Sequence, residues 1–237
     1  MKKISNITLL AIAAVFLILR VNFRYFPLSN IVILVLLAIV FHNSENKKSA
    51  SMILALVIGI LGLVAPFIIS IFSSSATILN FIDNVIKIIE NDSNDLAQYI
   101  NNIKSMGNSI INLINYSIVG YLVSLIALGS SISIMTYAEA SDKKKAKKQV
   151  VIFIVTASLT IVSSLLMLFG LSNLIFALTN CVTANTENIF TTEFYLYITT
   201  AIILLSISVI PGIAQFIMLI INIITIKNCD TKIEIIE

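Results

Sequence analysis

The chain has 237 residues, of which 58% are hydrophobic and only 11% are charged, with a net charge of +3 and a mean hydropathy of +1.03. Soluble domains carry about 25% charged residues, so this composition excludes an ordinary soluble protein, and the small net charge argues against a nucleic-acid partner. With two cysteines and one histidine, we expect no metal site, cofactor or disulfide framework. The apolar residues come in long blocks, which predicts an all-α, polytopic bundle of transmembrane helices.

The first 49 residues contain two apolar blocks. Lys2 and Lys3 precede the first block, as in a secretory signal, but no small-residue cleavage site follows it. We therefore expect an uncleaved first span over residues 4–24 and a second span over residues 31–41. Both blocks are short against the roughly 20 residues that cross a bilayer. Residues 1–49 are thus expected to form an N-terminal transmembrane hairpin, or a shallow hairpin within the membrane.

Four longer apolar blocks make residues 50–237 the expected four-span body. Their predicted spans cover residues 50–72, 110–135, 150–176 and 194–226, which gives about six spans in all. Pro211 and Gly212 lie in the middle of the last block. They predict a kink in a single helix, because two half-spans would expose unsatisfied backbone groups to lipid. The alternative is a discontinuous helix of the kind that forms transporter binding sites.

The segment 74–108, between the third and fourth spans, has a different pattern. Its apolar residues recur at helical spacing opposite polar residues, and a polar run at 91–94 separates two such stretches. This predicts an external amphipathic helical hairpin whose apolar faces pack together, lie on the membrane surface or bind another protein. The candidate interaction surface comprises Ile78, Phe81, Ile82, Val85, Ile89, Leu96, Ile100 and Ile103.

A cluster of lysines follows the fourth span, and we interpret it as a topology anchor, with binding of anionic lipid headgroups as the alternative. This lysine anchor comprises Lys143, Lys144, Lys145, Lys147 and Lys148. Glu139 lies four residues before Lys143, which predicts that the anchor begins as a helical extension of the fourth span.

The distribution of lysines also predicts the orientation of the chain. By the positive-inside rule, both termini are cytoplasmic and the net acidic hairpin is external, with Arg20 and Arg24 as exceptions. We expect a multi-pass protein of the plasma membrane. The high content of Ile, Asn and Lys is typical of a low-GC bacterium.

No residue pattern indicates catalysis. The interiors of the third to sixth expected spans contain no ionisable residue, which argues against proton-coupled transport. Hydroxyl residues are frequent in these spans, and we interpret them as helix-packing contacts in preference to a polar solute path. His42 and Cys229 would both be cytoplasmic, but no orienting carboxylate or amide accompanies them as a cysteine peptidase requires. We therefore expect no enzyme activity.

These observations favour a non-enzymatic accessory, regulatory or immunity-type subunit. Its expected partners are the lipid bilayer and another membrane protein or a second copy of the chain. The alternative is a permease or substrate-binding subunit for a neutral or apolar solute. Six spans in this length resemble the solute-binding subunits of some bacterial vitamin importers. The Ala-xxx-Ala pattern of their first helix is absent, because Ala11, Ala13 and Ala14 lack that spacing.

Overall fold

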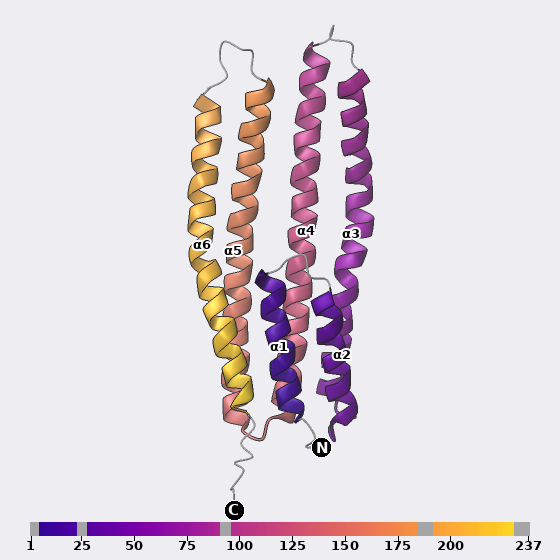
Figure 1. Cartoon of the computed structure of the whole chain (residues 1–237), viewed down its shortest axis with the longest axis vertical. Helices are drawn as coiled ribbons and strands as arrows, with labels where there is room; N and C mark the ends of the chain where they lie inside the picture. Colours follow the sequence, from indigo (N-terminus) through magenta and orange to yellow (C-terminus); the bar gives the residue numbers. More distant parts are fainter. Residues whose placement is uncertain (1–4, 23–27, 91–95, 184–191, 230–237) are drawn as a thin grey trace, which may run out of the picture. The chain divides into compact units, whose positions relative to one another are not determined.

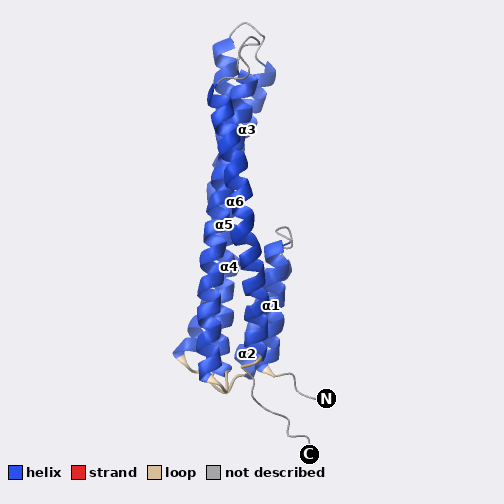
Figure 2. Ribbon diagram, turned by 90° about the vertical axis from the view of Figure 1, so that its left-hand side faces the viewer, coloured by secondary structure: helices blue, strands red, loops and turns tan. Residues whose placement is uncertain are grey.

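The computed structural model describes residues 5–22, 28–90, 96–183 and 192–229. Within these ranges the chain forms six α-helices and no strand (Figures 1 and 2). The helices are α1 (Asn6–Asn22), α2 (Leu28–Asn43), α3 (Ala50–Glu90), α4 (Leu96–Glu139), α5 (Lys143–Thr183) and α6 (Thr192–Lys227). The prediction of an all-α chain is thereby confirmed for the part that the structure describes.

Four of these helices are long and apolar enough to cross a membrane. The qualifying stretches are Ala50–Ile69, Gln98–Glu139, Lys143–Cys181 and Thr192–Lys227. They belong to α3, α4, α5 and α6, where the third to sixth spans were expected. Helices α1 and α2 have 17 and 16 residues, or about 25 Å each at 1.5 Å per residue. They are shorter than a hydrocarbon core of about 30 Å, so the count of six spans stays a prediction.

No helix break separates the expected third span from the amphipathic segment that follows it. Helix α3 continues through Ser73, Ser74 and Ser75 to Glu90, because serine lowers helix propensity only slightly and no glycine or proline occurs in residues 67–90. Helix α4 likewise runs without interruption from the amphipathic segment into the expected fourth span. The two arms of the predicted hairpin are therefore the ends of long helices.

The chain divides into two compact units, each built from several segments. Unit 1 comprises Met1–Pro66, Leu122–Thr160 and Gly212–Glu237, and unit 2 comprises Phe67–Tyr121 and Ile161–Pro211. All four long helices contribute to both units. Helices α1 and α2 belong to unit 1, where they pack against each other.

Unit 1 is held together by apolar packing and by close approach of helix backbones. The fully buried large side chains of α1, α2 and α4 include Leu10, Leu37, Leu125, Leu128 and Met135. A Cβ on Gly62 would lie 2.8 Å from the Cβ of Ala127. Gly62 therefore lets α3 approach α4 more closely than any other residue would, as small residues do at helix contacts in membranes.

Unit 2 contains the remaining parts of α3, α4, α5 and α6, and neighbouring helices contact one another in that order. Asn84 of α3 donates to the hydroxyl of Ser105 on α4 at 2.9 Å. Gly107 of α4 faces Thr179 of α5, and Gly170 of α5 faces Leu205 of α6. These contacts place the expected external hairpin against α5.

Candidate functional site

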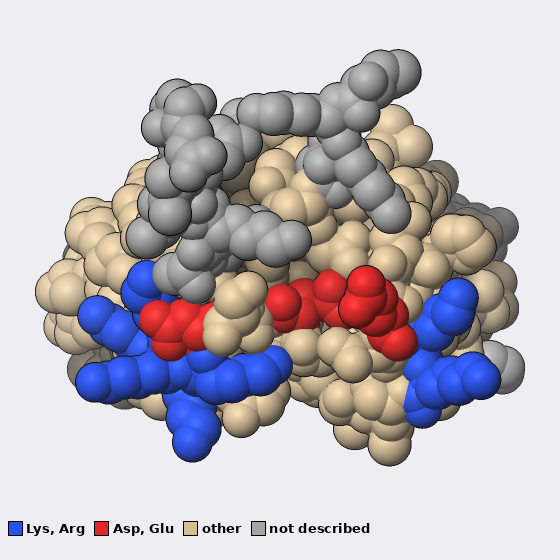
Figure 3. Space-filling view, turned by 90° about the horizontal axis from the view of Figure 1, so that it is seen from below, with Lys and Arg blue, Asp and Glu red and all other residues tan. Residues whose placement is uncertain are grey.

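The lysine anchor occupies the first turns of α5. All five of its lysines are exposed, whereas Ala146 between them is buried. Seen from this end, Lys side chains gather in two groups with acidic side chains between them (Figure 3). Lys47 and Lys48, just before α3, are exposed as well. The exposed cluster fits the expected anchoring role.

Asp142 caps the helix that carries the anchor. Its Oδ1 accepts hydrogen bonds from the backbone N–H groups of Lys144 at 3.0 Å and Lys145 at 3.1 Å. The hydrogen bond from the Lys145 backbone is the main cause that lowers the pKa of the Asp142 carboxyl below its ordinary value. Lys143 donates to the carbonyl oxygens of Tyr137 and Ala138 at 2.6 Å and 3.1 Å, so it satisfies the last turn of α4.

The predicted helical extension of the fourth span is wrong. Helix α4 ends at Glu139 and α5 begins at Lys143, so these two residues do not share a helix. Glu139 accepts hydrogen bonds from Asn6 Nδ2 at 2.6 Å and Ser44 Oγ at 2.5 Å. These hydrogen bonds come from α1 and from the α2–α3 connection in unit 1. They offset the cost of partly burying the Glu139 carboxylate.

A cluster of buried polar side chains lies in unit 1. Gln149 of α5 donates through Nε2 to Ser133 Oγ of α4 at 2.9 Å and to Asn222 Oδ1 of α6 at 3.0 Å. All three side chains are at most 3% exposed. This amide cluster joins α4, α5 and α6. Sequence reasoning missed it, because Gln149 follows the lysine anchor and looks like part of a solvated turn.

The hydroxyl residues of the expected spans are mostly satisfied within the protein. Thr156 and Thr160 are buried, and each donates to the carbonyl oxygen four residues earlier at 2.8 Å. Ser131 donates across the helix contact to the carbonyl oxygen of Ala55 at 2.6 Å. These hydrogen bonds agree with a packing role, since the donors that a polar solute would need are already used.

The expected interaction surface is divided between packed and exposed residues. Ile103 is buried, and Phe81, Val85 and Ile100 are half-buried, whereas Leu96 lies in α4 with its side chain outside the described residues. The remaining members are exposed, and two further apolar residues of α3 extend them into a stripe. This apolar stripe comprises Ile78, Leu79, Ile82, Ile86 and Ile89, which are between 44% and 77% exposed. With 3.6 residues per turn they lie within about 100° of one another on the helix.

The burial of Asn84 explains why the packed face of α3 differs from the apolar face that the sequence predicts. It was expected on the polar face, but it is 8% exposed and donates to the carbonyl oxygen of Asn80 and to Ser105. The packed face of α3 therefore centres on Asn84, Phe81 and Val85. A polar residue with a partner opposite is buried at low cost, and this leaves part of the apolar face uncovered.

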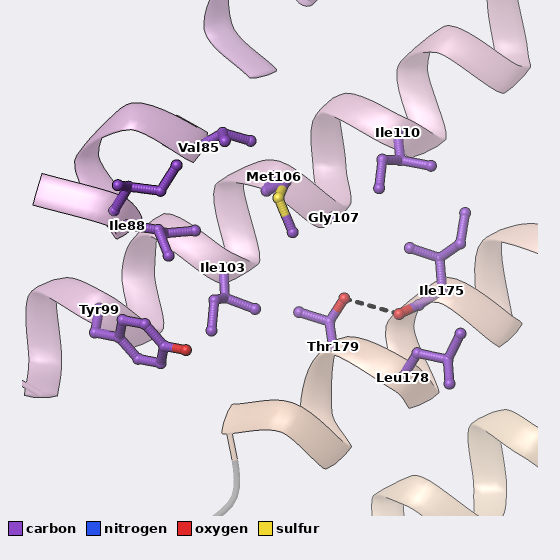
Figure 4. A pocket seen from close by; sticks show the side chains of 11 residues that line it. Val85, Ile88, Tyr99, Ile103, Met106, Gly107, Ile110, Ile175, Leu178 and Thr179 are labelled. Carbon is purple, nitrogen blue, oxygen red and sulfur yellow. Dashed lines mark hydrogen bonds between the residues drawn. The ribbon is translucent and has the colours of Figure 1, made fainter. Parts of the chain in front are cut away.

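An apolar pocket lies beside the stripe in unit 2. Its volume is about 390 Å³. The lining residues come from α3, α4 and α5: Val85, Ile88, Ile89, Tyr99, Ile103, Met106, Gly107, Ile110, Ile175, Leu178 and Thr179. Figure 4 shows side chains of α4 and α5 facing one space, with the hydroxyl of Thr179 bonded to the carbonyl oxygen of Ile175 at 2.8 Å. The lining is almost entirely hydrocarbon.

Pro211 and Gly212 lie inside α6, which runs from Thr192 to Lys227 as one helix. The two half-helices of the alternative prediction are therefore not formed. Pro66 likewise lies inside α3. Each of these prolines removes one backbone N–H from its helix, and the kink expected at Pro211 stays a prediction.

The chain matches no family model, no curated protein and no solved structure. The described helices are those of a membrane protein with several spans.

Proposed function

We propose that this chain is a non-enzymatic accessory or regulatory membrane subunit that binds another membrane protein, or a second copy of itself, through the apolar stripe of α3. The observation that carries the proposal is the stripe itself. Five large apolar side chains, each between 44% and 77% exposed, lie along one face of a helix. Contiguous exposed apolar surface of this kind marks interaction sites in proteins.

The position of the stripe along α3 supports an extramembrane location. If Lys47, Lys48 and the lysine anchor mark the cytoplasmic surface, the hydrocarbon begins near Ala50. A core of about 30 Å takes about 20 residues of a perpendicular helix, and about 26 residues at a 40° tilt. The stripe begins 28 residues after Ala50, at Ile78. Lipid tails would then not cover the stripe, so we expect a protein partner to cover it.

Charges next to the stripe support the same location. Asp83 and Lys87 form an ion pair on α3, with side chains 60% and 50% exposed. Burial of these charges in lipid would cost several kcal/mol, about 2.5–3.5 kcal/mol for Asp at the centre of a span. Asn80 is exposed beside them. A partner that covers the stripe therefore meets an apolar centre with a charged rim, which is the usual anatomy of a protein interface.

The second candidate function is that of a permease or substrate-binding subunit for a neutral or apolar solute. The apolar pocket in unit 2 favours it, because the lining offers no charge and few polar atoms. The two functions predict different partners. A permease of this kind would co-purify in fixed stoichiometry with an ATPase or another transport component.

Co-purification of two differently tagged copies, together with cross-linking in native membranes, tests the proposed function. The substitution Ile82→Asp places a charge in the centre of the stripe. Leu196→Asp is the matched control, because Leu196 is also exposed in unit 2 but lies on α6. We expect Ile82→Asp to abolish association with a partner or second copy and Leu196→Asp to leave it intact. Equal association of both variants with every partner would contradict the proposal.

A further inference from the structure

We infer that the apolar pocket of unit 2 binds a single long acyl chain. The pocket has about 390 Å³, at the lower end of the roughly 300–1,000 Å³ of small-molecule sites. A space of this size can hold one slender apolar group.

The chemistry of the lining selects an acyl chain over a polar ligand. Only Tyr99 and Thr179 bring side-chain oxygens to the pocket, and the hydroxyl of Thr179 already donates to Ile175. A charged or hydrogen-bonding ligand would lose its bonds to water without replacement, which costs at least about 1–3 kcal/mol for each group. An acyl chain has no such groups, and each buried CH₂ contributes about 0.8 kcal/mol.

The pocket is continuous with an apolar track on the surface. Ile89 lines the pocket, is 77% exposed and is also the last member of the apolar stripe. Leu178, on the α5 wall, is 54% exposed as well. An extended chain can therefore enter between Ile89 and Leu178, at the end of the stripe remote from Leu79, and contact hydrocarbon as it enters. A compact apolar solute would use only the pocket.

A glycine shapes the base of this pocket. Gly107 has no side chain, and a Cβ there would lie 2.6 Å from Thr179 Oγ1. Helices α4 and α5 therefore approach closely at this point. Ile103 and Met106 face the resulting space (Figure 4). Apolar walls on both sides of a close helix contact suit a chain of methylene groups.

The acyl chain can come from a membrane phospholipid or from a free fatty acid, and the same experiment separates the two sources. The chain contains no Trp, so Tyr99→Trp places a single fluorophore at the pocket. Leu79→Trp is the control, on the stripe but outside the pocket. Full-length variants in detergent are titrated with phosphatidylcholine or stearic acid brominated on the chain, since bromine quenches an indole that it contacts.

We expect saturable quenching of Trp at position 99, to roughly half or less of the starting fluorescence, because a ligand enclosed in the pocket keeps its bromine atoms in contact with the indole. The control Trp at position 79 should show only weak quenching that does not saturate. Saturation with the phospholipid alone, with stearic acid alone or with both identifies the source. Absence of saturable quenching with either probe would overturn the inference.

Variants that fill or charge the pocket complete the test. Val85→Phe combined with Met106→Phe adds volume, and Leu178→Asp adds charge at an exposed wall position without filling the interior. Either change should remove the saturable quenching, whereas Leu196→Asp should retain it. Helix content and elution volume check that each variant folds. Unchanged saturable quenching in the folded Leu178→Asp variant would overturn the inference even if the Phe variant did not fold.

Discussion

Two glycines on α3 allow a matched test of the packing in unit 1. Substitution of either Gly59 or Gly62 by Ala gains about 1 kcal/mol of helix propensity, so any difference between the two variants comes from their neighbours. A Cβ on Gly62 would lie 2.8 Å from the Cβ of Ala127 and 3.2 Å from the backbone nitrogen of Leu128. Carbon atoms need about 3.5–4.0 Å, and neither of these atoms can rotate away.

Gly62→Ala should therefore force α3 and α4 apart by roughly 1 Å, at an overpacking cost of about 1–3 kcal/mol. After the gain in propensity, we expect a net loss of about 0–2 kcal/mol in the free energy of unfolding. At Gly59 the nearest atoms are Ser131 Oγ at 3.1 Å and Leu37 Cδ1 at 3.2 Å. The nearest of these contacts is longer than the nearest at Gly62, and Leu37 Cδ1 is the end of a flexible side chain, although Ser131 Oγ is held by its bond to Ala55. Gly59→Ala should therefore cost less than Gly62→Ala.

Cys229 provides a native probe for this comparison. It lies in unit 1 with its side chain fully buried and its Sγ bonded to the carbonyl oxygen of Thr225. In a Cys181→Ser background, the rate of maleimide labelling against temperature reports the opening of unit 1. We expect the Gly62→Ala protein to label at a lower temperature than the Gly59→Ala protein. Equal transitions, or a more stable Gly62→Ala protein, would refute the packing argument.

Three further predictions concern the lysine-bearing end of unit 1. A double-mutant cycle on Gln149→Ala and Asn222→Ala should give a coupling of about 0.6 kcal/mol, with an upper range near 1.7 kcal/mol, and a coupling of zero would show that their hydrogen bond does not stabilise the fold. Burial, followed by the charge of Asp142, raises the pKa of the Cys229 thiol. Alkylation of Cys229 in the folded protein at neutral pH should therefore be slow, and it should be faster in the Asp142→Asn variant. An unchanged rate in this variant would contradict the prediction. Folding lowers the pKa of Asp142, so its capping of α5 stabilises the protein above the ordinary carboxyl pKa. This stabilisation is lost as the pH falls through the pKa of Asp142 in the folded protein. Amide exchange in the first turn of α5 should become faster over the same pH range.

Much of the fold could be predicted from the sequence, because long apolar blocks leave the backbone no alternative to a helix in lipid. The expected third to sixth spans all lie within long helices of the structure. The continuity of α3 and α4 beyond those spans was not predicted. Polar residues such as Ser73 and Asn80 signal a change of environment, but only proline or glycine reliably signals a change of backbone.

The candidate site was harder to predict, since burial depends on partners far away in the sequence. A helical wheel places Asn84 with the exposed residues, and only the position of Ser105 on α4 explains its burial. Because α3 packs on α4 through the side that carries Asn84, Ile82 and Ile89 stay exposed. The pocket needs side chains from three helices, and the amide cluster joins Gln149 to a residue 73 positions away. Neither has a local sequence pattern.

Cysteine labelling from the two sides of the membrane tests the orientation and the exposed hairpin most directly. In a Cys181→Ser/Cys229→Ser background, single cysteines replace Asp83 on α3 or Lys145 on α5, both of which are exposed. A membrane-impermeant maleimide is applied to intact cells and again after permeabilisation. We predict that the cysteine at position 83 is labelled in intact cells and the one at position 145 only after permeabilisation. The reverse pattern, or protection of position 83 under both conditions, would contradict an external stripe on a chain with cytoplasmic lysines.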